Sequence, residues 1–279
     1  MSAQPPGSPL RSDEAKLTAR SIADFGEQWT RYPDNPGYYG SLELLADILE
    51  PLARPSEIRG QTVADIGSGT GRVVRMLAEA GAGRIVAVEP SDAFFVLKRN
   101  TADISDRVEY VHGRGEELPG EGVLDLVVAL GVLHHVPEPG PIVRRAYGAL
   151  RPGGTLLVWL YGREGNGLYL AIATPLRVLT RWMPHTLLAG LCRILDVPLV
   201  AYMWLCRRAP LPMHGYINRH LARLTPEVRR VTIYDQLNPA WAKYYRHDEA
   251  VALLADAGFV DIRAHNRHGY SWTVAGTHP

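Results

Sequence analysis

The chain has 279 residues, of which 46% are hydrophobic and 21% are charged, and its formal net charge is +1. This composition is typical of a folded globular protein, and the length allows one large domain with a sizeable insertion. The near-neutral charge gives no basis for nucleic-acid binding, which normally leaves a basic footprint. The two cysteines, Cys192 and Cys206, have no metal-type spacing and are typical of a reducing compartment, so we expect a cytoplasmic protein.

The N-terminal part predicts a helical cover over a larger fold. Residues 1–12 are polar and rich in proline and lack an apolar signal core, so they predict a disordered lead-in. Residues 13–58 predict helices, the first with Ile22, Phe25 and Trp29 on one face. The aromatic loop that follows contains Tyr38 and Tyr39, which we expect to contact a substrate.

The run from Val63 to Arg72 predicts a cofactor site. An apolar strand ends in Asp65, then Gly67, Gly69 and Gly71 alternate with other residues, and a helical pattern follows. Glycines let the backbone turn sharply and lie against a ligand, while the N-terminus of the next helix directs free N–H groups at it. A nucleotide-like cofactor is therefore expected here.

The spacing of this run argues against a dinucleotide. The dinucleotide fingerprint needs a third glycine where this chain has Arg72 or Val74, and the carboxylate of Asp65 would repel a pyrophosphate. A carboxylate suits a ligand that carries an ammonium group and a sulfonium. At this point the chain resembles the class I S-adenosylmethionine-dependent methyltransferases, whose first motif is Asp/Glu-x-Gly-x-Gly-x-Gly.

Further segments match that family in order over residues 60–161. A second strand closes on Glu89 and Pro90, where a carboxylate can accept hydrogen bonds from both ribose hydroxyls. The resemblance implies that Ser68 belongs to the cofactor turn and that the backbone at Leu130 and Gly131 lies near the methionine part. Where the family commonly offers an acidic residue to the adenine amino group, this chain has Arg114. Arg114, Gly115 and Glu116 are expected to lie beside the cofactor, and either Glu116 or the backbone of Gly115 makes the contact with the amino group.

The alternation of strands and helices predicts an α/β fold. The resemblance implies a doubly wound, mostly parallel seven-stranded sheet with an antiparallel last strand. Residues 59–161 and 247–279 would form the Rossmann-like cofactor domain, which closes with a helix (249–257) and two strands (260–264 and 270–275).

Residues 162–246 interrupt this alternation and predict a largely helical insertion that binds substrate or acts as a lid. The insertion is rich in tyrosine and tryptophan, and the expected substrate contacts in and beside it are Tyr161, Glu164, Tyr244 and Tyr245. Two interpretations stay open: helices that simply close over the sheet edge, or an apolar entrance for a hydrophobic or membrane-dissolved substrate. No stretch reaches the ~18 uncharged residues of a membrane span, so we expect no stable insertion, although contact with a membrane surface stays open.

Histidines supply the candidate general bases, because histidine titrates near neutrality. His134, His135 and His247 are the candidates, with Glu164 and His268 as further ones, and none stands out. His134 and His135 are adjacent on a loop and point in different directions, so we expect no metal site there.

The sequence thus predicts an S-adenosylmethionine-dependent methyltransferase that acts on a small aromatic or hydrophobic molecule by in-line methyl transfer. One alternative is a methyltransferase of a membrane-dissolved quinone or lipid. The others are an NAD(P)-dependent oxidoreductase and a protein that binds S-adenosylmethionine without methyl transfer. The oligomeric state is left open.

Overall fold

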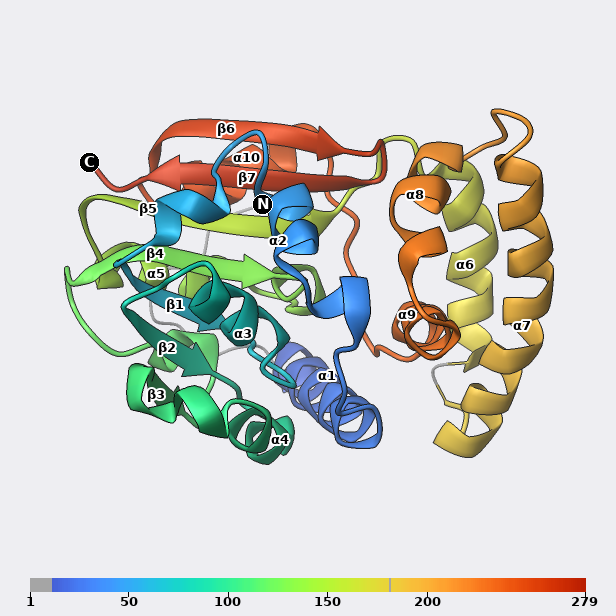
Figure 1. Ribbon diagram of the computed structural model, residues 1–279, viewed down its shortest axis with the longest axis horizontal. Coiled ribbons are helices and arrows are strands. Elements are labelled where there is room, and N and C mark those ends of the chain that lie inside the picture. Colours follow the sequence, from blue (N-terminus) through green and yellow to red (C-terminus); the bar gives the residue numbers. More distant parts are fainter. Residues whose placement is uncertain (1–11, 181) are drawn as a thin grey trace.

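The centre of the molecule is a seven-stranded sheet in the order β3-β2-β1-β4-β5-β7-β6 (Figure 1). The computed structural model describes residues 12–180 and 182–279, so the predicted lead-in 1–12 lies outside the described residues apart from Ser12. Neighbouring strands pair in parallel except β7, which is antiparallel to both β5 and β6, and the predicted fold class is confirmed. The strands are β1 (Thr62–Ile66), β2 (Arg84–Val88), β3 (Val108–Val111), β4 (Leu124–Leu130), β5 (Leu150–Tyr161), β6 (Val260–Arg267) and β7 (Ser271–Thr277).

Helices cover both faces of the sheet, because successive strand residues point to opposite sides. In β4, Val127 and Ala129 belong to one hydrophobic core with α5 and α10, while Leu126 and Val128 belong to a second core with α2, α3 and α4. A parallel sheet that is buried on both faces requires such continuously apolar strands. The covering helices are α2 (Leu42–Leu49), α3 (Arg72–Glu79), α4 (Ala93–Asn100), α5 (Gly140–Ala149) and α10 (His247–Ala255).

A separate helical layer lies beyond the carboxyl ends of the parallel strands (Figure 1). It consists of α6 (Gly167–Thr180), α7 (His185–Cys206), α8 (His214–Arg219) and α9 (Pro226–Leu237). Both α6 and α7 pack on α9, and a buried ion pair joins α7 to α9 through Asp196 and Arg229, with Nε and Oδ1 2.5 Å apart. The N-terminal helix α1 (Ser12–Arg31) packs on α4 and borders the space between the sheet and this layer.

Two element boundaries differ from the sequence prediction. The fifth strand, which the sequence predicts over Thr155 to Tyr161, begins at Leu150. Leu150 pairs with Leu124 before the register shifts and Thr155 pairs with Leu126. The final hairpin turns within His268 and Gly269, whose φ values of 51° and 78° fit a tight turn of left-handed residues. The strands of this hairpin are therefore longer than the periodicity alone predicted.

Candidate functional site

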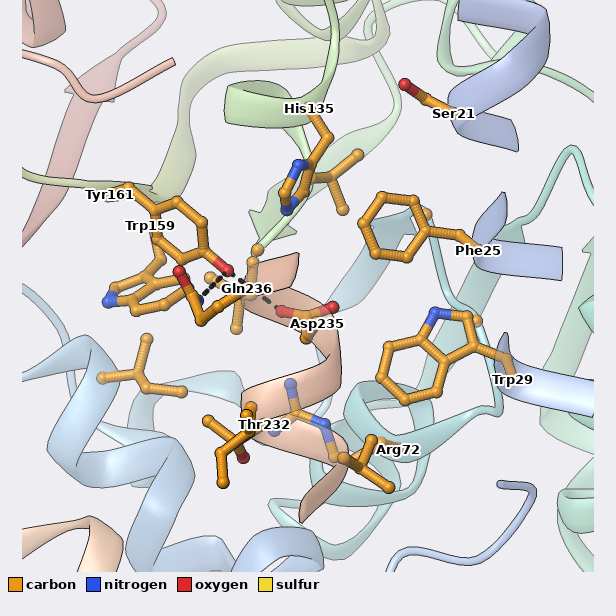
Figure 2. A pocket seen from close by; sticks show the side chains of 18 of the residues that line it. Ser21, Phe25, Trp29, Arg72, His135, Trp159, Tyr161, Thr232, Asp235 and Gln236 are labelled. Atoms are coloured by element: carbon orange, nitrogen blue, oxygen red, sulfur yellow. Dashed lines mark hydrogen bonds between the residues drawn. The ribbon is translucent and has the colours of Figure 1, made fainter. Parts of the chain in front are cut away.

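A cavity of about 550 Å³ lies between the carboxyl ends of the strands and the helical layer. It opens beside β1 and β4, where the strand order reverses, and such switch points are the usual ligand sites of open α/β sheets. Figure 2 shows part of its wall. The lining comes from α1, from the loops after β1, β2, β3 and β4, from the end of β5 and from the helical layer.

The glycine turn after β1 forms one end of this cavity. Gly67, Gly69 and Gly71 have φ values of 74°, 53° and 84°, a region that side chains disfavour. A Cβ on Gly67 would lie 2.5 Å from a methyl carbon of Val132, so the loops after β1 and β4 approach closely only because the side chain is absent. Gly67, Ser68 and Gly69 line the cavity, whereas Gly71 lies behind them at the start of α3.

Glu89, at the end of β2, holds this turn through a hydrogen bond. Its Oε2 accepts a hydrogen bond from the Gly69 N–H at 2.8 Å, and its Oε1 accepts bonds from the Ser91 N–H and hydroxyl. Burial raises the pKa of Glu89, and these three donors oppose the shift because they stabilise the carboxylate. Glu89 and Pro90 both line the cavity, so a buried carboxylate stands where the second strand ends.

Two further carboxyl groups at this end have an oxygen without a partner. Asp65 Oδ2 and Glu116 Oε2 are buried and accept no hydrogen bond from the described residues. Burial raises the pKa of Asp65 to about 7. Buried polar atoms normally find partners, so these two oxygens fit the donor groups of a ligand. Glu116 lines the cavity, whereas Asp65 lies just behind its wall.

The segment after β3 completes this end. Arg114 pairs with Glu116 at 3.1 Å, which turns the arginine that departs from the family pattern toward its own neighbour. Gly115 is also forced to be small, since a Cβ would lie 2.8 Å from Ile142. Arg114 and Gly115 line the cavity, and so do Leu130 and Gly131 at the end of β4.

The other end of the cavity has an aromatic wall. Phe25 and Trp29 of α1 face Trp159 and Tyr161 of β5 across it (Figure 2). The Phe25 ring lies 4.6 Å from that of His135, centroid to centroid. Tyr244 stacks on Tyr161 at 5.3 Å and also lines the cavity, as does Tyr39. A flat apolar molecule would fit between such rings.

Polar side chains of α9, in the helical layer, also lie in this aromatic wall. The Tyr161 hydroxyl donates to Asp235 Oδ2 at 3.0 Å and accepts from Gln236 Nε2 at 2.7 Å (Figure 2). Burial raises the pKa of Tyr161 well above its usual value, so this phenol stays protonated and remains the donor. Asp235 Oδ1 also accepts from Gln28 of α1 at 3.2 Å, which ties the layer to the N-terminal helix.

The two adjacent histidines after β4 have different environments. His135 points into the cavity (Figure 2), and its Nδ1 lies 3.0 Å from the carbonyl oxygen of Trp241. Because a carbonyl only accepts, Nδ1 carries the proton and Nε2 is left as an acceptor. Burial lowers the pKa of His135, so the ring is neutral. His134 stacks on Tyr161 at 3.7 Å and lies outside the cavity lining.

Several residues predicted for the site lie elsewhere. Glu164 accepts hydrogen bonds from the His247 N–H and the Trp272 indole and so holds the start of α10. His247 itself is exposed beside Asp248. Tyr245 is buried in the core that α5 and α10 share with the sheet, and Tyr38 packs beneath the guanidinium of Arg223 at 3.7 Å. These four side chains support the fold, and none of them lines the cavity.

Other lining residues were not predicted. Phe25 and Trp29 were assigned to a helix face that packs on the fold, and that apolar face instead lines the cavity. Trp159 lies in a strand pattern that marks no residue as functional. Asp235 is an acidic residue in a helix, and only its half-buried position beside Tyr161 gives it significance. Among the described residues, no group of three or more His, Cys, Asp or Glu side chains could hold a metal ion.

Comparisons with known proteins agree on one family. Residues 64–158 match the family described as a methyltransferase domain. The ubiquinone biosynthesis O-methyltransferase of Azorhizobium caulinodans is 36% identical over 130 residues, which are 46% of this chain and 51% of that protein. The chain thus matches about half the length of this relative.

Solved structures share the fold. The magnesium protoporphyrin IX methyltransferase of Synechocystis, a structure with bound S-adenosylhomocysteine, has a TM-score of 0.56 and 14% identity, covering 96% of this chain and 100% of that one. The 1,6-didemethyltoxoflavin-N1-methyltransferase of Burkholderia thailandensis has a TM-score of 0.52 and 18% identity, covering 98% and 93%. At these identities the likeness shows the fold alone.

Proposed function

Because the chain belongs to the class I S-adenosylmethionine-dependent methyltransferases, we propose that it transfers a methyl group from that cofactor to a small aromatic or hydrophobic molecule. One observation carries this proposal: the acidic glycine-turn end and the aromatic wall belong to a single cavity. A methyl donor held at one end would meet a flat acceptor held at the other. Positioning of this kind can lower a barrier by up to about 7–11 kcal/mol.

The residues of the glycine-turn end suit this cofactor. When bound, S-adenosylmethionine supplies an electrophilic methyl carbon on a sulfonium. We assign the ribose hydroxyls to Glu89, the adenine amino group to the unpartnered oxygen of Glu116, and the ammonium group to that of Asp65. A cation near Asp65 would favour its ionised form and oppose the burial that raises its pKa to about 7.

The aromatic wall would bind the acceptor and exclude water. Phe25, Trp29 and Trp159 offer ring faces, and the Tyr161–Asp235 pair offers a fixed dipole to a polar substituent. We propose His135 as the group that takes the proton of a substrate hydroxyl or amine, because its ring is neutral and its Nε2 is an acceptor. A buried, water-poor site strengthens each of these interactions.

The domain assignment follows from the same geometry. We propose that residues 59–161 and 247–279 bind the cofactor, that residues 13–58 cover the site, and that residues 162–246 select the substrate. The near-neutral charge supports a small-molecule substrate over nucleic acid. The two free cysteines, Cys192 and Cys206, support a cytoplasmic location. An NAD(P)-dependent oxidoreductase is disfavoured, since Arg72 occupies a glycine position of that fingerprint.

A second candidate function is methylation of a membrane-dissolved quinone or lipid. The observation that favours it is the apolar exposed surface of α6 and α7. The relative from Azorhizobium caulinodans carries a name from ubiquinone biosynthesis, which is consistent with this candidate. A third candidate function is binding of the cofactor without methyl transfer.

Calorimetric titration tests the proposal first. The protein would be titrated with S-adenosylmethionine, S-adenosylhomocysteine, NAD and NADP. We expect the two adenosyl ligands to bind and both dinucleotides to fail; binding of a dinucleotide alone would refute the assignment. A panel of phenols, aromatic amines and short-chain quinols with labelled methyl donor then tests transfer. Tight cofactor binding without turnover on any acceptor class would favour the non-methylating reading.

A further inference from the structure

The outer side of α7 exposes an apolar stripe. Leu187, Ile194, Val197 and Trp204 are spaced seven, three and seven residues apart, so they lie along one side of the helix. Ile194 is 69% exposed and Val197 71% exposed. Figure 1 places α7 at the edge of the molecule farthest from the sheet. Exposed apolar patches of this kind mark interaction surfaces.

The preceding helix continues this surface. Leu179 near the end of α6 is 72% exposed, and Trp182 follows in the connection to α7. We call the exposed apolar side chains of the two helices the α6–α7 face. Trp204 belongs to this face, and Trp182 lies beside it beneath the guanidinium of Arg20 of α1. Tryptophans at such places are typical of the boundary between water and lipid, where an indole has an apolar body and a polar edge.

The segment of the sequence that contains α6 and α7 is basic. Residues 165–226 contain seven arginines, at positions 177, 181, 193, 207, 208, 219 and 223, and a single acidic residue, Asp196. Asp196 is buried against Arg229 and so adds no negative charge to the surface. In the described part of the chain, Arg193, Arg207 and Arg208 are exposed and form no ion pair, and the Arg208 guanidinium lies over Trp204 at 3.6 Å.

Among the described residues, α7 is the one helix long and apolar enough to cross a membrane by length and composition. The buried Asp196–Arg229 pair holds it against α9, and this contact would be lost if the helix spanned a bilayer. Lying along the membrane surface keeps that contact and buries the apolar stripe as well.

The opposite side of α7 faces the cavity. Leu195, Leu199 and Tyr202 line the cavity, and their mean direction is about 140° around the helix from that of the stripe. On α6, Ile172 both lines the cavity and is exposed, so the cavity reaches the surface beside the α6–α7 face.

We propose that the α6–α7 face binds the surface of a membrane that contains anionic phospholipids, and that the acceptor is a lipid-soluble molecule that passes from this membrane into the cavity beside Ile172. The membrane contact is carried by the apolar stripe and the unpaired arginines; only the second part rests on the proposed function. The arginines would contact lipid phosphates while the stripe lies among the upper acyl chains.

Co-sedimentation with vesicles tests the membrane contact. The full chain would be mixed with vesicles of phosphatidylcholine alone and of phosphatidylcholine with phosphatidylglycerol. We expect binding to the anionic vesicles that weakens as salt is raised. Ile194→Glu with Val197→Glu should lower the partition coefficient about tenfold or more. Arg207→Glu with Arg208→Glu should lower it only on the anionic vesicles.

The control is Val123→Glu with Val260→Glu, which places the same two charges on exposed valines at the other end of the sheet and should bind as the unaltered protein does. Circular dichroism would check that each variant is folded. Equal binding to both vesicle types, or unchanged binding by the stripe variant, would overturn the proposal. So would sedimentation velocity showing a dimer that the stripe variant converts to monomer, because a second copy would then cover the face.

Titration with S-adenosylhomocysteine without lipid keeps the two proposals apart. A protein that binds vesicles but not the adenosyl ligand refutes the proposed function and leaves the membrane contact standing. The reverse result refutes the membrane contact alone.

Discussion

Replacing Glu89 by glutamine tests the assignment of the cofactor end most directly. The substitution keeps the size of the side chain and removes one acceptor oxygen. In the structure the two oxygens of Glu89 accept from Gly69 and from Ser91, so one backbone N–H will face the new amide N–H₂ whichever way the amide turns. An unsatisfied buried donor costs about 1–3 kcal/mol.

The same substitution would weaken the ribose contact that we propose for Glu89. A carboxylate can accept from two hydroxyls at once, whereas an amide offers one acceptor atom and no charge. Losing one charge-assisted hydrogen bond costs about 1.5–3 kcal/mol, so we expect the Kd for S-adenosylhomocysteine to rise roughly 10- to 100-fold.

Isothermal titration calorimetry of the variant measures this change. The matched control is Glu109→Gln, which makes the same chemical change on β3, where Glu109 is paired with Arg84 away from the cavity. The control should bind within about twofold of the unaltered protein. A folded Glu89→Gln protein that binds equally well would refute the role given to Glu89, whatever the control shows.

Three further predictions concern the helical layer, the base and the glycine turn. Asp196→Ala should lower the free energy of unfolding by about 3–5 kcal/mol in urea titrations, because it leaves Arg229 buried without a partner, and adding Arg229→Met should restore most of the loss. Burial alone would raise the pKa of Asp196, but the hydrogen bonds and charge of Arg229 hold it below its usual value. The stabilisation by this ion pair is therefore present above about pH 4 and lost as the pH falls further. A free energy of unfolding that does not fall with pH below 4 would contradict this prediction. His135→Asn should lower kcat/KM about 10²- to 10⁴-fold, and a variant with the full rate would remove His135 from the mechanism. Because burial lowers the pKa of His135, kcat/KM of the unaltered enzyme should not yet fall as the pH is lowered through 6.5, and should fall only at a more acidic pH. Gly67→Ala should cost at least about 2 kcal/mol of stability, whereas Gly122→Ala, with a similar φ of 63° and open space around it, should cost about 1 kcal/mol, and equal losses in thermal melts would show that the close approach is unimportant.

The cofactor end of the cavity could be predicted from the sequence because its signals are local. Gly67 and Glu89 each follow directly on a strand, Gly69 comes two residues after Gly67, and the carboxyl ends of neighbouring parallel strands meet at one edge of the sheet. A pattern of a few residues therefore determines both the turn and its place in the fold. The α/β class followed from the local alternation of strand and helix patterns, and the seven-stranded sheet followed from the resemblance to the methyltransferase family.

The substrate end could not be predicted in the same way. Tyr38, Glu164, Tyr245 and His247 were selected for their chemistry or their place in an aromatic run, and the structure uses them to hold loops and helix ends. Side chains of these types serve packing and binding equally well, so residue type alone does not separate the two roles.

Only the tertiary structure brought together the parts of the aromatic wall. Phe25 and Trp29 come from the first helix, Trp159 from the fifth strand and Asp235 from the helical layer, and more than 200 residues separate the first from the last. Their meeting depends on how α1 and α9 pack across the ends of the strands. Such packing depends on the summed burial of whole helix faces. The spacing of apolar residues shows that a helix has an apolar face, but it does not show which element that face packs against. The sequence by itself therefore determined the fold class and the cofactor turn, and the packing of distant helices decided what the cavity can hold.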